Sequence, residues 1–324
     1  MCSRRLVRPA RLAMGLVAAV HFGYPGTAMA DVLRETALPL ALAAANSAGS
    51  AERSAGKLSE MYEAGQRALL NQDYPAALRL LRGAAEQGLA RAQNALGGMY
   101  LAGLGAAPDD AEALNWYRKA AEQGYAAAQA SLGLMYAQGR GVALDEATGV
   151  KWLRRAAEQD DALGQSNLGV MYLEGRGVDQ DDVQAKKWTH KAAIHGEPLA
   201  QYNLGLLFRD ARGVERDDIE AAWWLRKSAE QGNADAQTAL GMMYDEGRGV
   251  HKDYAEAVQW LGKGAGQGNA LAQYRLGVSF AQGKGVAQDR NQALKWLTLA
   301  ARQGLEPARD YLWTYSNISV EPSN

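Results

Sequence analysis

The chain repeats itself every 36 residues, and this period constrains its fold more than any other feature. The unit at residues 233–268 lands on a near copy of itself when it is moved by 36 residues in either direction. Self-similarity at a fixed period of this length is typical of a stacked array of small helical units rather than a closed globule. Six full units follow one another without insertion or deletion, at residues 89–124, 125–160, 161–196, 197–232, 233–268 and 269–304.

The first half of each unit reads as an amphipathic helix with a glycine in its middle. Ala92, Leu96 and Tyr100 show the spacing in the first unit, because residues four apart share one face of a helix. Glycine in a helix interior costs about 1 kcal/mol relative to alanine, so we expect a compensating close approach of two helices. The glycines are Gly97, Gly133, Gly169, Gly205, Gly241 and Gly277, and the small residues expected to face them are Ala113, Gly149, Ala185, Ala221, Ala257 and Ala293.

The second half of each unit begins with an aspartate and carries a tryptophan. An aspartate directly before a helical pattern, such as Asp109, is a favourable N-cap, so we interpret these residues as caps rather than metal ligands. Burial of an indole contributes about 2–3 kcal/mol, and we expect the recurring tryptophans in the core. They are Trp116, Trp152, Trp188, Trp224, Trp260 and Trp296.

The segments that flank the six units depart from the pattern. Residues 57–88 read as a degenerate N-terminal helix pair, and residues 305–315 as a single capping helix in which Trp313 stands at the glycine position. Residues 316–324 read as a tail. The Ala- and Ser-rich residues 31–56 are expected to form a flexible lead, with a marginal helix at its start as the alternative.

Residues 1–30 have the composition of a secretory signal peptide. A cationic start with four arginines precedes a short apolar run and the small residues Ala28-Met29-Ala30, which predict cleavage before Asp31. The apolar run is too short for a membrane anchor, which needs about 20 residues. We therefore expect a periplasmic protein, with secretion as the alternative, and no membrane-spanning segment in the mature chain.

Charge and cysteine content exclude several classes of protein. The chain has 35 basic and 36 acidic residues; without the four arginines of the predicted signal, 31 basic residues remain and the formal charge is −5. That acidity disfavours a nucleic-acid binder. Cys2 is the only cysteine and leaves with the signal, so the mature chain holds neither a disulfide nor a thiolate metal site.

Taken together, the recurring residues identify a family. The pattern Ala-x-x-x-Leu-Gly-x-x-Tyr, Gly-x-Gly-Val, Asp and Ala-x-x-Trp-x-x-x-Ala-Ala-x-Gln-Gly resembles the Sel-one-like repeat, a relative of the tetratricopeptide repeat. The resemblance implies an all-α, right-handed α/α superhelical solenoid that serves as a scaffold for protein–protein contacts, including a regulatory use in the bacterial envelope. Members with many cysteines bind β-lactams, but this chain lacks those cysteines.

The resemblance also indicates where a partner would bind. By analogy with tetratricopeptide arrays, the first helix of each unit lines the concave face, where variable polar and aromatic side chains are expected to contact a protein or peptide. The candidates there are Asn167, Tyr202, Asn203, Arg209 and Tyr274. Trp223 replaces a polar residue of the other units, and we expect either a contact on the convex side or packing into the adjacent repeat.

No set of residues in the sequence indicates catalysis. Three histidines remain after the signal, at 190, 195 and 251, and neither His-Glu-x-x-His nor Gly-x-Ser-x-Gly occurs. The sequence therefore predicts a non-enzymatic exported scaffold without cofactor or metal. A protein that interacts with cell-wall glycan or β-lactam is the alternative.

Overall fold

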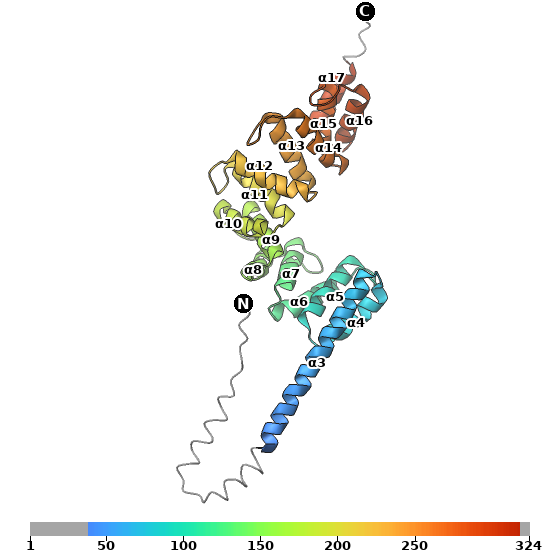
Figure 1. Cartoon of the computed structure of the whole chain (residues 1–324), viewed down its shortest axis with the longest axis vertical. Coiled ribbons are helices and arrows are strands. Elements are labelled where there is room, and N and C mark those ends of the chain that lie inside the picture. Colours follow the sequence, from blue (N-terminus) through green and yellow to red (C-terminus); the bar gives the residue numbers. More distant parts are fainter. Residues whose placement is uncertain (1–37, 318–324) are drawn as a thin grey trace, which may run out of the picture. The chain divides into compact units, whose positions relative to one another are not determined.

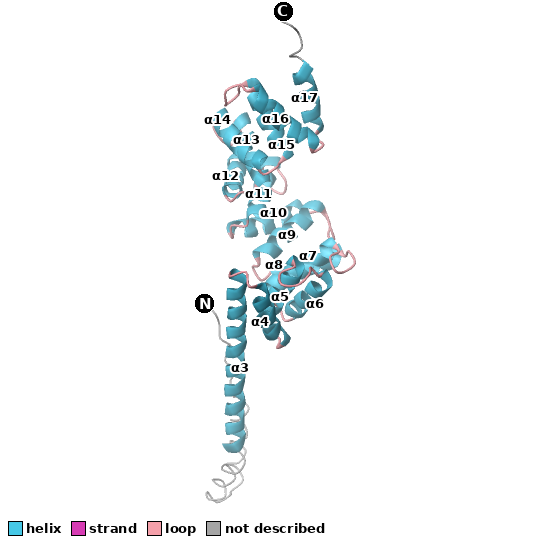
Figure 2. Cartoon of the chain, turned by 90° about the vertical axis from the view of Figure 1, so that its right-hand side faces the viewer, coloured by secondary structure: helices cyan, strands magenta, loops and turns pink. Residues whose placement is uncertain are grey.

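A computed structural model describes residues 38–317, and every regular element in that range is an α-helix (Figures 1 and 2). The chain divides into two units, residues 1–64 and residues 65–324. Helix α3, Leu38–Leu70, spans the boundary between them. The predicted signal peptide lies outside the described residues.

The described part of the first unit, residues 38–64, is helical throughout. The flexible lead expected over residues 31–56 is therefore wrong for residues 38–56, and residues 31–37 lie outside the described range. Alanine is the strongest helix former, and residues 38–56 contain many alanines and only two glycines, so composition that resembled a linker supports a helix.

The second unit is an α/α solenoid of short helices, nearly all of 13 residues. After α3 the helices are α4 Tyr74–Glu86, α5 Ala90–Ala102, α6 Asp110–Glu122, α7 Ala126–Gln138, α8 Glu146–Ala157, α9 Ala162–Glu174, α10 Asp182–Ile194, α11 Pro198–Asp210, α12 Asp218–Glu230, α13 Ala234–Glu246, α14 Tyr254–Gly266, α15 Ala270–Gln282, α16 Arg290–Arg302 and α17 Glu306–Asn317. From α5 onward, the odd-numbered helix is the first of each repeat and the even-numbered helix is the second.

From α4 onward, each helix packs mainly on its neighbours in the chain. Helix α9 also contacts α7 and α11, which are the first helices of the two flanking repeats. The first helices of these three repeats thus lie side by side. The main helix–helix contacts among the described residues are within a repeat or between neighbouring repeats, as expected for a repeat array.

The helices begin and end at the capping residues that the sequence predicts. The side chain of Asp109 accepts hydrogen bonds from the backbone amides of Ala111 and Glu112 at 3.0 Å each, which caps α6. At the other kind of end, Gly175 closes α9 with φ +68°, a left-handed conformation that favours glycine. Ala211 occupies the same conformation after α11, with φ +55°.

The loop after each first helix holds the preceding repeat. Arg176 Nε donates to Glu146 Oε1 at 2.6 Å, and a Cβ on Gly177 would overlap the backbone carbonyl of Glu146. The glycine thus serves close approach as well as positive φ. The same ion pair joins Arg140 to Asp110, Arg212 to Asp182 and Arg248 to Asp218.

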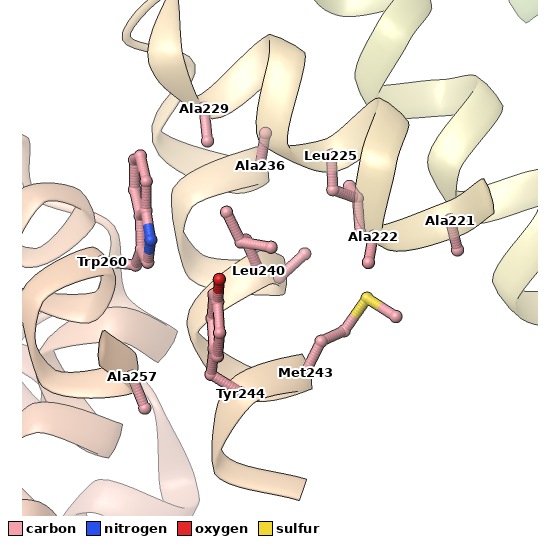
Figure 3. Close-up of a cluster of buried hydrophobic side chains, with 11 residues drawn as sticks. Ala221, Ala222, Leu225, Ala229, Ala236, Leu240, Met243, Tyr244, Ala257 and Trp260 are labelled. Atoms are coloured by element: carbon pink, nitrogen blue, oxygen red, sulfur yellow. The ribbon is translucent and has the colours of Figure 1, made fainter. Parts of the chain in front are cut away.

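The core runs through the repeats as a series of overlapping clusters (Figure 3). In the cluster around α13, Leu240 and Tyr244 of α13 are buried together with alanines of α12, and Trp260 of α14 packs on the other side of the cluster. Met243 extends toward Ala222 of α12. The recurring tryptophans are buried at positions 116, 188, 224 and 260 and half-buried at 152 and 296.

The mid-helix glycines are buried, and helices do approach closely there, but the main contact is not the one expected. A Cβ on Gly133 would lie 2.8 Å from Leu153 Cγ and 2.9 Å from the carbonyl oxygen of Gly149. The side chain one turn beyond the small residue therefore fills most of the space. Equivalent side chains are Tyr117, Thr189, Leu225, Leu261 and Leu297, and at Gly97 and Gly277 no atom of Ala113 or Ala293 is among the three nearest.

The C-terminal helix stands alone after the sixth pair. Helix α17 reaches Asn317, so the capping helix expected over residues 305–315 is slightly longer. Trp313, at the position that holds a buried glycine in the full repeats, is 73 % exposed. The rest of the expected tail, residues 318–324, lies outside the described range.

Candidate functional site

A tyrosine–arginine pair closes the seam between most consecutive repeats. The guanidinium of Arg118 in α6 donates to the hydroxyl of Tyr136 in α7 at 3.1 Å, and Arg154 donates to Tyr172 at 2.8 Å. The same bond joins Arg82 to Tyr100 and Arg226 to Tyr244. Each pair spans 18 residues of sequence and ties a second helix to the first helix of the next repeat.

Both members of this pair are replaced at two seams: between α14 and α15, where Gly262 and Phe280 stand, and between α10 and α11. At the α10–α11 seam the replacements lie beside a pocket. His190 stands in the arginine position and Phe208 in the tyrosine position, so neither the long cation nor the hydroxyl is present. A pocket of about 500 Å³ lies at this seam. Its lining comes from α10, α11 and α12 and consists of Lys186, His190, Phe208, Ile219, Glu220, Trp223 and Trp224.

The floor and walls of this pocket are largely apolar and aromatic. The rings of His190 and Trp224 meet edge to face, with centroids 6.0 Å apart. Burial lowers the pKa of His190, and Lys186 lowers it further, whereas Glu220 acts in the opposite direction. The lowered pKa favours the neutral imidazole, which suits contact with apolar groups.

Trp223 forms the rim of the pocket and is 48 % exposed. Its ring lies perpendicular to that of Trp224, with centroids 4.4 Å apart, and the amine of Lys227 lies 4.5 Å from its centroid. In α6 and α14 the corresponding lysine covers the buried indole instead, as Lys119 does for Trp116 at 4.0 Å. Ile219, one turn before Trp223, is 72 % exposed and extends the apolar rim.

Three of the five residues expected to contact a partner from the first helices lie on α11. Arg209 forms a bidentate ion pair with Asp210, with both N–O distances 2.7 Å. This ion pair raises the pKa of Arg209. Burial raises the pKa of Tyr202, and the charge of Asp235 adds to it. Asn203 is half-buried. Arg209 thus lacks the free charge that partner recognition would use, whereas Tyr202 contributes to the α12–α13 core cluster.

The other two expected residues lie on different helices. Asn167 on α9 donates its amide to the carbonyl of Leu163 at 2.8 Å, which is a bond within its own helix. Tyr274 on α15 packs edge to face with Tyr311 of α17, with centroids 6.3 Å apart. The five candidates on the first helices therefore do not converge on one site, whereas Trp223 belongs to a formed pocket.

Sequence reasoning missed His190 and Phe208, although a signal was present. Each departs from the repeat pattern, and the two departures lie 18 residues apart, the same spacing as Arg118 and Tyr136. A paired departure at the spacing of a contact indicates a rebuilt seam. Within residues 38–317, no three His, Cys, Asp or Glu side chains gather in a way that could hold a metal ion.

Comparison with known proteins places this geometry in a family. A family model described as Sel1 repeat matches seven consecutive segments, residues 53–89, 90–125, 126–161, 162–197, 198–233, 234–269 and 270–305. The chain belongs to the Sel1 repeat family. The segment expected as a degenerate pair at residues 57–88 falls within the first of these Sel1 repeats.

Two solved Sel1 repeat structures are similar to the chain. One is c5321, a protective antigen of uropathogenic Escherichia coli with an SLR fold: identity is 39 %, the TM-score is 0.69, and 81 % of this chain and 57 % of that protein are covered. The other is a Sel1 repeat protein from Oxalobacter formigenes, with 32 % identity, a TM-score of 0.68, and 74 % and 96 % coverage. This chain thus spans little more than half of c5321. Among curated proteins none matches.

Sel1 repeat proteins generally mediate protein–protein interactions and are typically non-catalytic scaffolds. The α/α solenoid and the family named from the sequence are confirmed. Among residues 38–317, no helix combines the length and apolar character that crossing a bilayer requires.

Proposed function

We propose that this protein is an exported, non-enzymatic scaffold of the bacterial envelope, which acts in the periplasm and binds a protein partner through the pocket rimmed by Trp223. The signal-like residues 1–30 support export. The observation that carries the binding site is the pocket at the α10–α12 seam, where His190 and Phe208 replace the Arg–Tyr pair of four other seams and where Trp223 and Ile219 are exposed.

The chemistry of the pocket favours an apolar or aromatic anchor from a protein. Interface anchors are typically large side chains that fill a pocket whose rim excludes water, and tryptophan is enriched among them. The neutral imidazole of His190 and the rings of Phe208 and Trp224 offer such a side chain an apolar floor. Lys186 and Glu220 add polar groups at the edge, which would orient the anchor.

The test compares Trp223→Lys with the wild type. Lysine is the residue at the equivalent positions 151 and 187, so this substitution restores a side chain that other repeats already carry. Lys295→Ala, at the equivalent position of the last full repeat, is the matched control. Partners crosslinked in envelope extract are identified and purified, and their affinities are measured with each variant. We expect at least a tenfold weaker complex with Trp223→Lys, because buried aromatic anchors typically contribute about 2 kcal/mol or more.

Three results would contradict the proposal. Equal affinity of wild type and Trp223→Lys would remove the pocket as the binding site. Retention on purified peptidoglycan without any protein partner would favour the glycan alternative. Turnover of chromogenic β-lactam or ester substrates that survives rigorous purification would show an enzyme. Export is tested by the N-terminal sequence of protein from the periplasmic fraction, which should begin at Asp31.

A further inference from the structure

A second pocket lies between α13 and α15, where one core methionine is missing. Most first helices bury a methionine at the same position: Met99, Met135, Met171 and Met243, with Leu207 in the fourth full repeat. Figure 3 shows Met243 extending from α13 toward α12. In α15 the equivalent residue is Ser279, whose hydroxyl donates to the carbonyl of Arg275 in its own helix at 3.0 Å.

The shorter serine leaves space that neighbouring side chains do not fill. A pocket of about 210 Å³ is lined by Ser279, Arg275 and Gln282 of α15, Asp245 of α13 and Lys284 of the following loop, among others. Cores are otherwise close-packed, so a recess of this size beside charged groups marks a place for a small polar group rather than a packing defect.

Arg275 is the unusual member of this pocket. Its Nε is buried and has no hydrogen-bond partner, and its guanidinium makes no ion pair with any residue of the described range. The equivalent residues are small or uncharged: Ala95, Ser131, Asn167, Asn203 and Ala239. A buried donor of a charged group is costly to leave unpaired, and a planar guanidinium is well matched to a carboxylate.

The other charges around the pocket leave Arg275 without compensation. Lys284 Nζ lies 2.8 Å from Asp245 Oδ1, and it also lies 4.3 Å from the ring centroid of Tyr254. The carboxylate of Asp245 is therefore already paired. The charged residues that line the pocket sum to one positive charge, which matches one incoming carboxylate.

We infer that this pocket binds one carboxylate of a protein partner. The guanidinium of Arg275 would pair with the carboxylate, which would occupy the space beside Ser279 that a methionine fills in other repeats. The inference deepens the proposed scaffold role, and rests on it for the partner being a protein. The carboxylate comes either from the C-terminus of the partner or from one of its aspartate or glutamate side groups. Both sources present the same planar group to Arg275.

Small probes separate these two sources and need no partner. N-acetylglycine presents a terminal carboxylate, the methylamide of N-acetylaspartate presents a side-group carboxylate, and N-acetylglycinamide is the uncharged control. Each is titrated into the full-length mature protein while NMR follows the Arg275 Nε–H signal and the backbone amides of Ser279 and Lys284. We expect saturable shifts with at least one acid, and the acid that binds more tightly identifies the source.

Two variants remove the site by different routes. Arg275→Gln removes the charge, and Ser279→Met restores the side chain that other repeats carry and closes the recess. We expect each to weaken binding of the acid at least tenfold, as judged from the backbone amides, whereas Arg302→Gln, an exposed arginine at the end of α16, should stay within twofold. If one variant fails to fold, the other still decides.

The inference fails if the uncharged control binds as tightly as the acids, if Arg275→Gln binds within twofold of the wild type, or if neither acid gives a saturable shift at about 50 mM, a concentration that would reveal even millimolar affinity. Such a failure would leave the Trp223 pocket untouched, because that pocket is tested with separate variants and a protein partner. Loss of partner binding in Trp223→Lys with intact acid binding would likewise affect only the anchor pocket.

Discussion

Gln159 donates its side-chain amide to the Oε1 of Gln129 at 2.7 Å, and this bond recurs at the end of nearly every repeat. The buried glutamine of the first helix also donates to the preceding repeat, as Gln129 does to the carbonyl of Ala121 at 3.1 Å. Equivalent glutamine pairs join Gln123 to Gln93, Gln231 to Gln201, Gln267 to Gln237 and Gln303 to Gln273. Each buried amide is thereby satisfied on both sides, which a polar group inside a core requires.

The exception predicts a stabilising substitution. Gln165 is fully buried, yet its Oε1 has no partner among the described residues, because His195 stands where the other repeats have glutamine. The backbone at His195 matches that at Gln123, with φ near −78° in both. We expect His195→Gln to raise the free energy of unfolding by about 1 kcal/mol in urea titrations. The reverse change, Gln159→His, should lower the free energy of unfolding by a similar amount. Equal stability of the wild type and both variants would show that the glutamine pairs do not stabilise the fold.

The loop glycine that touches the preceding repeat should tolerate no side chain. Gly177 combines φ +65° with direct overlap of any Cβ and the Glu146 carbonyl, whereas Gly196 has φ +87° and nothing within 4 Å. We expect Gly177→Ala to destabilise the protein by about 3 kcal/mol or more, and Gly196→Ala by about 1–2 kcal/mol from the left-handed conformation alone. Guanidinium unfolding of both variants measures the overlap as their difference, and a difference near zero would contradict the close approach.

Ala211 is a strained cap that glycine should relieve. It ends α11 in the left-handed conformation, where five equivalent residues are glycine. Removal of its Cβ relieves about 1–2 kcal/mol of strain, and the greater conformational freedom of glycine in the unfolded chain offsets part of this gain. Ala211→Gly should therefore raise the free energy of unfolding by about 0.5–1 kcal/mol. Ala287→Gly, in the loop after α15 with ordinary φ, should lose stability instead. Thermal unfolding of the two variants gives opposite signs if the cap is strained.

Asp218 makes stability depend on pH in the acid range. Hydrogen bonds first from Arg216 and then from Arg248 lower the pKa of Asp218 from 3.8 to about 2. Asp218 therefore binds a proton more readily in the unfolded chain than in the folded one. Its contribution to stability is fully present above about pH 4 and is lost as the pH falls toward 2. Solvent screening limits the effect to about 1 kcal/mol. Urea unfolding from pH 2 to 7 should show a flatter profile for Asp218→Asn, and an unchanged profile would contradict the shift.

Rebuilding the closed seam should stabilise the fold and abolish the anchor pocket. The double variant His190→Arg, Phe208→Tyr restores the pair seen between Arg154 and Tyr172. We expect a coupling of about 1 kcal/mol, measured as the excess stability of the double variant over the sum of the single ones. The same variant should bind the partner at least tenfold more weakly. Undiminished binding by a protein that shows this coupling would contradict the assignment of the pocket.

Much of the fold was predictable because it depends on local patterns that repeat. The 36-residue period fixed the helix pairs, and Asp109 capped its helix as expected, since a cap needs only residues within three positions of it. The contact of Gly133 was harder to predict: it depends on how the two helices cross, which places Leu153 rather than Gly149 nearest. The helix at residues 38–56 was expected only as an alternative at the start of the segment, because alanine-rich composition suits both a linker and a helix.

The candidate site was less predictable than the fold. Trp223 was visible as an aromatic residue at a polar position, but its pocket depends on His190 and Phe208, which look unremarkable singly. Arg209 appeared available on the sequence, yet Asp210 beside it neutralises its charge. Site properties thus arose from pairs of departures, whereas fold properties arose from what all repeats share.

The contact of each loop with the preceding repeat has a consequence for how the number of repeats can change during evolution. Because Arg176 meets Glu146 at a spacing of 30 residues, and each kind of seam contact keeps its own spacing wherever it recurs, excision or duplication of a 36-residue stretch joins largely matching surfaces. Unequal crossing-over in the gene would therefore yield shorter or longer arrays whose internal junctions are already compatible. At the two proposed pockets, beside His190 and beside Arg275, such exchange would add or remove a binding site.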